Sequence, residues 1–249
     1  MTTLFVIAVI KRDNSIADIG YGFGFILITG FAFFSQDITQ SHRSIIISTC
    51  ILLWGGRLMY RIGRKNWSKH EDFRYKAWRT EWQKKGEIYL LLRSFLQVFV
   101  LQGIIIYLVS LSGLFGNTMQ IDTMKWYNYA GAMLWVTGFL FEFVGDIQLD
   151  RFLKSKQEGK EKSHIMKTGL WKYTRHPNYF GESLQWWGLA LVCLFGVNGS
   201  LIVFVSPILI TYLLLFVSGI PLLEKRWAGD KEWEEYKKKT NAFVPGPQK

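Results

Sequence analysis

Two acidic residues lie deep in one of the most apolar stretches of this sequence. Glu142 and Asp146 fall within the apolar segment 125–149, and Asp150 follows just beyond it. A spacing of four places all three on one face of a helix. Because an ionisable side chain in hydrocarbon costs a few kcal/mol, each needs a partner, a water-filled cavity or a function. We expect this face to contact protein or water, with an ion pair to Arg57 or Arg93 as the structural alternative.

A second polar cluster opens the apolar run that begins near residue 180. The sequence "YTRHPNYFGE" covers residues 173–182, and Pro177 is suited to the first turn of a helix because it has no N–H to leave unpaired. Asn178 and Glu182 are then one turn apart on the same face, and Gln185 and Trp186 continue that face. With Tyr179, these side chains predict a convergent polar site, although Glu182 alone could be structural.

Arginines at the end of segment 44–60 suggest what such a site would bind. Arg57, Arg61 and Arg64 share one helical face that runs to the membrane surface. Arg61 and Arg64 could extend to lipid headgroups, whereas the deeper Arg57 predicts a buried partner. Together with the acidic face, they predict a pocket for an anionic cofactor entering from the cytosol and an apolar substrate entering from the bilayer.

The elements that position these groups are membrane helices. The chain is 49% hydrophobic with a net charge of +11, and its apolar residues come in long runs. The first ten residues predict a short or tilted helix rather than a signal peptide. Of the 30 lysines and arginines, 26 fall in loops on one side, which predicts the N-terminus outside and the C-terminus in the cytoplasm. We expect one all-α integral-membrane domain, residues 1–249, with about seven helices: the first ten residues, 16–35, 44–60, 88–110, 125–149, 180–196 and 200–222.

Several other classes of function fit poorly. The basic residues are sorted by membrane side rather than gathered on one face, which disfavours nucleic acid. The four histidines are never paired, which disfavours a metal site. Cys50 and Cys193 lie in apolar segments and are interpreted as buried thiols. Glycines in "GYGFGF" and "WGGRL" predict helix packing rather than a dinucleotide loop.

Four pieces in one order carry a family resemblance: "WGGRLMYRIGRKNWSKHEDFRY", "DIQLDRFLK", "GLWKYTRHPNYFGESLQWWG" and "PLLEKRWAGDKEWEEYKKKTNAFVP". With these, the chain resembles the bacterial branch of the steroid 5-alpha-reductase-like family, known as DUF1295, from about residue 14 to residue 245. The resemblance implies a seven-helix reductase that uses NADPH to reduce a carbon–carbon double bond of an apolar lipid, sterol-like or terpenoid substrate. It also implies a bacterial inner-membrane location with the site open to the cytoplasm.

By residue matching, the resemblance assigns roles along the chain. Glu182 and Tyr179 would be catalytic, either one donating a proton, and Trp54, Glu142 and Trp186 would line the substrate pocket. The residues that would hold NADPH are Arg57, Arg64, Asn66, Asp146, Lys154, Arg175, His176, Asn178, Glu224 and Arg226. The excess of arginine favours NADPH over NADH, because NADPH carries an additional 2′-phosphate. The planar guanidinium of arginine is well suited to donate two hydrogen bonds to one phosphate.

One position departs from the family pattern. Trp54 stands where the steroid-reducing branch has a substrate-facing tyrosine, and the preceding segment has no glutamate. This argues against steroid enones and leaves another lipid or terpenoid double bond as the alternative. A second class, the S-adenosylmethionine-dependent isoprenylcysteine or phospholipid methyltransferases, shares the "RHPNYFG" pattern and an acidic, tyrosine-bearing tail. The substrate and the oligomeric state are left open by the sequence.

Overall fold

The protein was analysed as a computed structural model, which describes residues 1–35, 41–66, 71–118, 123–194 and 201–248. The side chains of Lys65, Asn66 and Phe73 lie outside the described part. Within these ranges the chain is helical and contains no strand, apart from an isolated parallel bridge between Thr174 and Asn241. It forms two compact units, residues 1–123 with 195–203 and residues 124–194 with 204–249. That the whole chain is a single domain stays a prediction.

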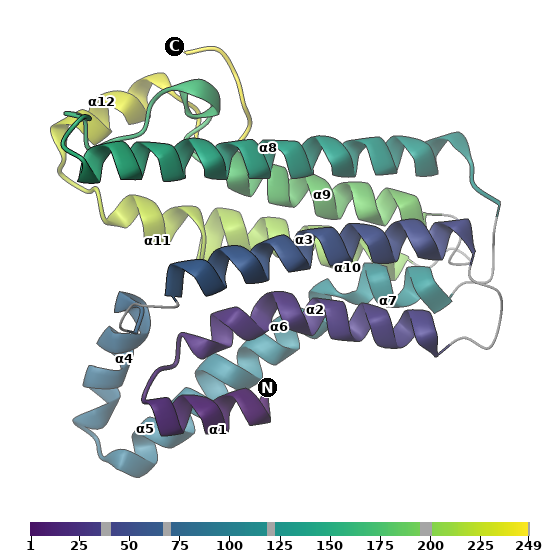
Figure 1. Ribbon diagram of the computed structural model, residues 1–249, viewed down its shortest axis with the longest axis horizontal. Coiled ribbons are helices and arrows are strands. Elements are labelled where there is room, and N and C mark those ends of the chain that lie inside the picture. The colour runs from purple at the N-terminus through teal and green to yellow at the C-terminus, as the bar shows by residue number, and fades with distance from the viewer. Residues whose placement is uncertain (36–40, 67–70, 119–122, 195–200, 249) are drawn as a thin grey trace. The chain divides into compact units, whose positions relative to one another are not determined.

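The first unit pairs two long apolar helices and adds a charged helical hairpin. Its helices are α1 (Thr2–Lys11), α2 (Ile16–Phe34), α3 (His42–Asn66), α4 (Phe73–Gln83), α5 (Glu87–Arg93), the π-helix η1 (Ser94–Val100), α6 (Leu101–Val109) and α7 (Leu111–Thr118). Helices α5, η1 and α6 follow one another without a break (Figure 1).

Glycines let the helices of the first unit approach closely. A Cβ at Gly22 would lie 2.8 Å from the carbonyl oxygen of Gly55, so α2 and α3 meet backbone to backbone. A side chain of α1, Leu4, packs against Gly20, and a side chain of α6, Ile106, packs against Gly24. The predicted packing role of these four glycines is confirmed, because any added side chain would collide. The same prediction for Gly56 is wrong, since a Cβ there would meet nothing within 4 Å.

The charged helix α4 is fixed by one apolar face and several ion pairs. Tyr75 and Trp82 are buried against Ala8 of α1 and Leu90 of α5. Asp72 caps the helix by accepting a 3.0 Å hydrogen bond from the backbone N–H of Arg74. Helix α4, which has many basic residues, is therefore an ordered part of this unit rather than a solvated loop.

The second unit is built on α8 (Trp126–Gln157) and α9 (Pro177–Cys193). It continues through α10 (Val205–Tyr212), the π-helix η4 (Leu213–Val217), α11 (Ile220–Lys225) and α12 (Lys231–Lys239). The short 3₁₀-helix η2 (Gly169–Lys172) precedes α9, and another, η3 (Leu201–Phe204), precedes α10. Helices α8 and α9 run side by side (Figure 1).

A ladder of glycines joins α8 to α9. Gly131, Gly138 and Gly145 recur every seven residues, two helical turns apart, and therefore lie on one face of α8. On α9, Gly181 and Gly188 have the same spacing. A Cβ at Gly131 would lie 2.7 Å from the carbonyl oxygen of Gly188, and one at Gly138 would lie 2.6 Å from that of Gly181. The two backbones are in direct contact, which is the arrangement that small residues permit between membrane helices.

Five helices of the described chain are long and apolar enough to cross a membrane: residues 16–34, 42–64, 87–109, 126–157 and 201–225. They match five of the predicted segments. The prediction of a polytopic, all-α membrane protein is confirmed. The other two segments are α9, with 17 residues, and α1, whose 10 residues extend about 15 Å, half of a hydrocarbon core of about 30 Å. The count of seven crossings and their orientation stay predictions.

Candidate functional site

A hydrogen bond between α8 and α9 forms the polar centre of the second unit. Gln185 Nε2 donates to Glu142 Oε2 over 2.6 Å, and both residues are buried. The glycine contact at Gly138 and Gly181 brings the helices close enough for this bond. Asp146, one turn along α8, is 4% exposed, whereas Asp150 is exposed. Glu142 and Asp146 thus face protein, as predicted.

The chain before α9 is anchored on the same part of α8. Trp171 Nε1 donates to the carbonyl oxygen of Gly145 over 3.0 Å, and the backbone N–H of Leu170 donates to Gln148 Oε1 over 2.9 Å. Gly169 has a φ of 63°, a conformation that favours glycine, at the point where the chain turns toward these contacts. These bonds set the position at which α9 begins.

Two buried acceptors, two turns apart on α9, receive no hydrogen bond from the described residues. They are Asn178 Oδ1, in the first turn of α9, and Gln185 Oε1, beside Glu142. A backbone contact places Asn178 against α8, since a Cβ at Gly145 would lie 3.4 Å from its amide nitrogen. Buried polar atoms are nearly always paired, so two unpaired acceptors indicate a place for a donor from a ligand.

Arg175, one of the residues predicted to hold NADPH, binds several groups of the C-terminal segment. It is 7% exposed, and its Nε and Nη2 each lie 2.9 Å from Glu224 Oε1. Its Nη1 donates to the carbonyl oxygens of Lys237 and Thr240 over 3.2 and 2.5 Å. The guanidinium also lies over the ring of Trp233. Since all three of its nitrogens have partners within the protein, Arg175 ties the C-terminal segment to the start of α9.

His176 belongs to the same cluster. Its Nε2 lies 3.1 Å from Glu224 Oε1, and its ring stacks on Tyr179 with centroids 5.5 Å apart. Burial lowers the pKa of His176 below 6.5, although the hydrogen bond to Glu224 opposes the shift. The imidazole is therefore largely neutral at pH 7. It orients Tyr179, one of the two predicted proton donors.

The C-terminal tail closes over the loop that precedes α9. Tyr236 donates its hydroxyl proton to the carbonyl oxygen of Trp171, and Thr174 donates to the carbonyl oxygen of Phe243 over 2.8 Å. The backbone N–H of Arg175 donates to the carbonyl oxygen of Asn241 over 2.9 Å. The tail is thus a structural part of the site.

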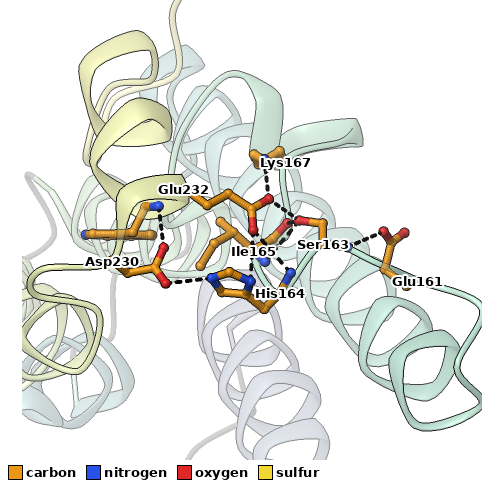
Figure 2. Close-up of polar contacts among 8 residues, drawn as sticks. Glu161, Ser163, His164, Ile165, Lys167, Asp230 and Glu232 are labelled. Carbon is orange, nitrogen blue, oxygen red and sulfur yellow. Dashed lines mark hydrogen bonds and ion pairs between the residues drawn. The ribbon is translucent and has the colours of Figure 1, made fainter.

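The loop after α8 is held by a charged cluster, drawn in Figure 2. His164 lies between two carboxylates, with Nε2 2.7 Å from Asp230 Oδ2 and Nδ1 2.9 Å from Glu232 Oε2. Lys167 and Ser163 also bond Glu232, each over 2.5 Å. Burial raises the pKa of Glu232, but the hydrogen bonds from Lys167 and Ser163 outweigh it and hold that pKa at about 2.

The structure gathers most of the predicted site residues into the second unit. The second unit holds Glu142 and Asp146 on α8, Asn178, Tyr179, Glu182 and Trp186 on α9, Glu224 on α11, and Arg175 and His176 in the loop before α9. Lys154 and Arg226 are exposed in the same unit, and Lys154 lies 3.9 Å from Glu158. The others, Trp54, Arg57, Arg64 and Asn66, lie on α3 of the first unit.

The residues of the first unit differ in exposure. Trp54 is buried and packs edge to face on Phe25, with ring centroids 5.1 Å apart. Arg57 is half-buried and Arg64 is exposed. The side chain of Asn66 lies outside the described part, so its predicted role stays untested. The roles of all predicted site residues stay predictions.

Three features of this site were not predicted. One is the hydrogen bond of Gln185 to Glu142, since the sequence places Gln185 on the polar face but does not give its partner. Another is the set of glycines on α8 and α9, for which the seven-residue spacing was a readable signal. The third is Thr174, which is fully buried and bonded to the tail. Nothing in the local sequence marks that contact, because its partner is 69 residues away.

These features define an all-helical membrane protein with a buried carboxylate and amide centre between two closely packed helices. A family model described as "Protein of unknown function (DUF1295)" matches residues 4–240. The chain belongs to this family, which confirms the resemblance in its sequence.

Two curated proteins are similar to part of the chain. They are "3-oxo-5-alpha-steroid 4-dehydrogenase 1" of Macaca fascicularis and its namesake of Homo sapiens, each 31% identical over 115 residues. The matched part is 46% of this chain and 39% and 40% of the two relatives, so the chain spans about two fifths of their length. No solved structure matches. Nothing in these comparisons supports the methyltransferase alternative.

Proposed function

We propose that this protein is a membrane-embedded oxidoreductase that uses NADPH to reduce a carbon–carbon double bond of an apolar lipid or terpenoid. Family membership and the similarity to two proteins named as steroid dehydrogenases support an oxidoreductase. NADPH, the type of bond reduced, the bacterial inner membrane and a site open to the cytoplasm rest on the resemblance.

The observation that carries the proposal is the unpaired buried acceptor Asn178 Oδ1. The carboxamide of a nicotinamide ring has an NH₂ group that can donate to such an acceptor. An unsatisfied buried acceptor costs about 1–3 kcal/mol, and a bound carboxamide would recover that cost. Asn178 is therefore assigned to orient the nicotinamide, and its acceptor fits the group.

The contacts of Arg175 affect which cations are assigned to the phosphates of NADPH. Because Glu224 and two backbone carbonyls already bind its nitrogens, Arg175 is assigned to hold the tail rather than phosphate. In the second unit, the exposed cations Lys154 and Arg226 remain the candidates for phosphate. Arg57 and Arg64 keep their predicted role from the resemblance alone.

The chemistry divides between the cofactor and the side chains. When bound, NADPH supplies hydride. Reduction then needs a proton at the other carbon of the double bond, and Tyr179 and Glu182 are the candidates to donate it. Tyr179 is held by its stack on the largely neutral His176. Trp54 argues against a steroid enone, so we expect the double bond of another lipid or of a terpenoid as the substrate.

Ligand titration with the purified protein tests this proposal. We expect NADPH to bind with an affinity that falls as salt rises, and Asn178→Ala to weaken it about tenfold, the value of a buried hydrogen bond. Arg151→Ala, an exposed position on α8, is the matched control and should not change the affinity. Glu182→Gln should slow NADPH oxidation with an active substrate more than it weakens NADPH binding.

Two results would overturn the proposal. One is binding of S-adenosylmethionine in place of NADPH, which would favour the methyltransferase. The other is NADPH affinity that is the same in Asn178→Ala and in the unmodified protein, which would remove the observation on which the proposal rests.

A further inference from the structure

A separate pocket lies in the first unit, and it is independent of the residues on which the proposed function rests. It has a volume of about 350 Å³, within the range of about 300–1,000 Å³ typical of ligand sites. The end of α1, helix α4, helix α5 and the start of η1 form its walls. We call it the α1–α5 pocket. None of the predicted site residues lines it.

The α1–α5 pocket lies where apolar surface gives way to charge. On α1, Val6 is 51% exposed and Ile10 is 76% exposed, and Lys11 and Arg12 follow directly. Such an exposed apolar helix with a basic end is suited to the boundary between hydrocarbon and headgroups. Arg12 ends the helix in the left-handed conformation, with a φ of 52°. These features suit the end of α1 to the level of the lipid headgroups.

One wall of the pocket is apolar. Val9 of α1 and Leu90 and Leu91 of α5 line it, and Leu90 is buried in the core beside Ala8. These side chains suit the glycerol and first methylenes of a lipid, which are apolar groups next to a polar head. A soluble anion would leave this wall without a partner.

The opposite wall holds a fixed arginine. Arg79 binds Glu71 through Nε and Nη2, at 2.9 Å from Glu71 Oε2 and Oε1 respectively. Glu71 Oε1 also accepts from the backbone N–H of Asn14 over 2.9 Å. A guanidinium has five N–H donors, so donors of Arg79 remain for a ligand while the ion pair holds its plane. Asn14 and Ser94, joined by a 3.1 Å hydrogen bond, complete this wall.

The charges of the lining are mixed in sign. Arg12 and Arg79 supply positive charge, and Glu87, at the start of α5, supplies negative charge. These three are the titratable groups among the lining residues, and Glu71 lies behind Arg79. The arginines attract an anionic group, and Glu87 attracts a cationic one. A zwitterion with a phosphate and an ammonium group matches both.

We propose that the α1–α5 pocket binds the headgroup of a phosphatidylethanolamine lipid. Its phosphate contacts Arg12 and Arg79, and its primary ammonium donates hydrogen bonds to Glu87. The lipid's glycerol end packs on Val9, Leu90 and Leu91. Phosphatidylcholine has the same phosphate, but its quaternary ammonium has no N–H to donate to Glu87, so the pocket distinguishes the two lipids.

Native mass spectrometry of the delipidated full-length protein tests the proposal with three lipids of equal acyl chains. We expect phosphatidylethanolamine to bind more tightly than phosphatidylcholine or phosphatidylglycerol. Arg12→Ala should weaken that binding about tenfold, as expected for one charged hydrogen bond. Glu87→Gln should abolish the preference over phosphatidylglycerol. Lys11→Ala, the adjacent cation outside the lining, is the control and should bind like the unmodified protein.

Three results would overturn the assignment. Equal binding of the three lipids would remove the headgroup specificity. Unchanged lipid preference in both Arg12→Ala and Glu87→Gln would place the lipid elsewhere. Displacement of the lipid by inorganic phosphate at an equal concentration would identify a simple anion site. Melting temperatures of the variants close to that of the unmodified protein show that each change acts on binding.

Discussion

Gln185 on α9 donates a 2.6 Å hydrogen bond to the buried carboxylate of Glu142 on α8. The bond joins the acidic face predicted on α8 to the polar start of α9. It also helps to explain how a carboxyl group is tolerated in an apolar segment, because a hydrogen bond from the amide offsets part of the cost of burial. Gln185 is thus both a structural partner of Glu142 and, through Oε1, a candidate ligand contact.

Removing the side-chain amide of Gln185 should destabilise the folded protein. We expect Gln185→Ala to lower the free energy of unfolding by about 2–4 kcal/mol, because it leaves a buried carboxylate without this partner. Thermal unfolding in detergent measures the change. Thr137→Ala removes an exposed hydroxyl that bonds only its own helix, and should change stability by less than about 0.5 kcal/mol. Equal melting temperatures for the two variants would contradict the structural role of the bond.

A methyl group in the glycine ladder should separate α8 from α9. Gly138→Ala would place a Cβ 2.6 Å from the carbonyl oxygen of Gly181, so the backbones must move apart. We expect a loss of about 3 kcal/mol or more, at the upper end of overpacking effects. Gly30→Ala is the matched control in a helix, because a Cβ there meets nothing within 4 Å. A small effect at both positions would show that the ladder is not tightly packed.

The contacts of Arg175 predict a local effect on the tail. Arg175→Lys keeps the charge, but one ammonium cannot bind Glu224 and two backbone carbonyls in the same geometry. We expect faster amide hydrogen exchange over residues 237–244, with little change in the first unit. Arg151→Lys, an exposed position on α8, should leave exchange unchanged. Protection of 237–244 in Arg175→Lys would show that other contacts hold the tail.

The cluster in Figure 2 predicts a pH dependence of stability. The pKa of Glu232 is lowered from 4.5 to about 2, so its ionised form stabilises the folded state. This contribution is fully present above about pH 4.5 and is lost as the pH falls toward 2. The melting-temperature difference between the unmodified protein and Glu232→Gln should therefore be constant from pH 5 to 6. Below about pH 4.5 the difference should become smaller.

Protonation of neighbouring groups has to be separated from that of Glu232. His164 Nδ1 lies 2.9 Å from Glu232, and its Nε2 lies 2.7 Å from Asp230. We expect His164→Asn to reduce the difference without abolishing its decline below pH 4.5. A difference that widens as the pH falls from 4.5 would have the wrong sign for a carboxylate with a lowered pKa.

The sequence by itself determined the helical class, the positions of the long apolar helices and the burial of Glu142 and Asp146. Those follow from local rules: hydrocarbon requires apolar runs of a set length, a spacing of four shares a face, and a charge in an apolar run cannot face lipid. The motif around Asn178 and Glu182 also marked the family.

Only the tertiary structure decided which partner satisfies each polar group. Arg175 was predicted to help hold NADPH, and only the structure shows that its nitrogens bond Glu224 and carbonyls more than 60 residues away. Gly55 meets another backbone whereas the adjacent Gly56 meets nothing. The α1–α5 pocket likewise joins residues from Ala8 to Ser94. Periodicity gives the face on which a residue lies, but its partner depends on which distant segment packs there.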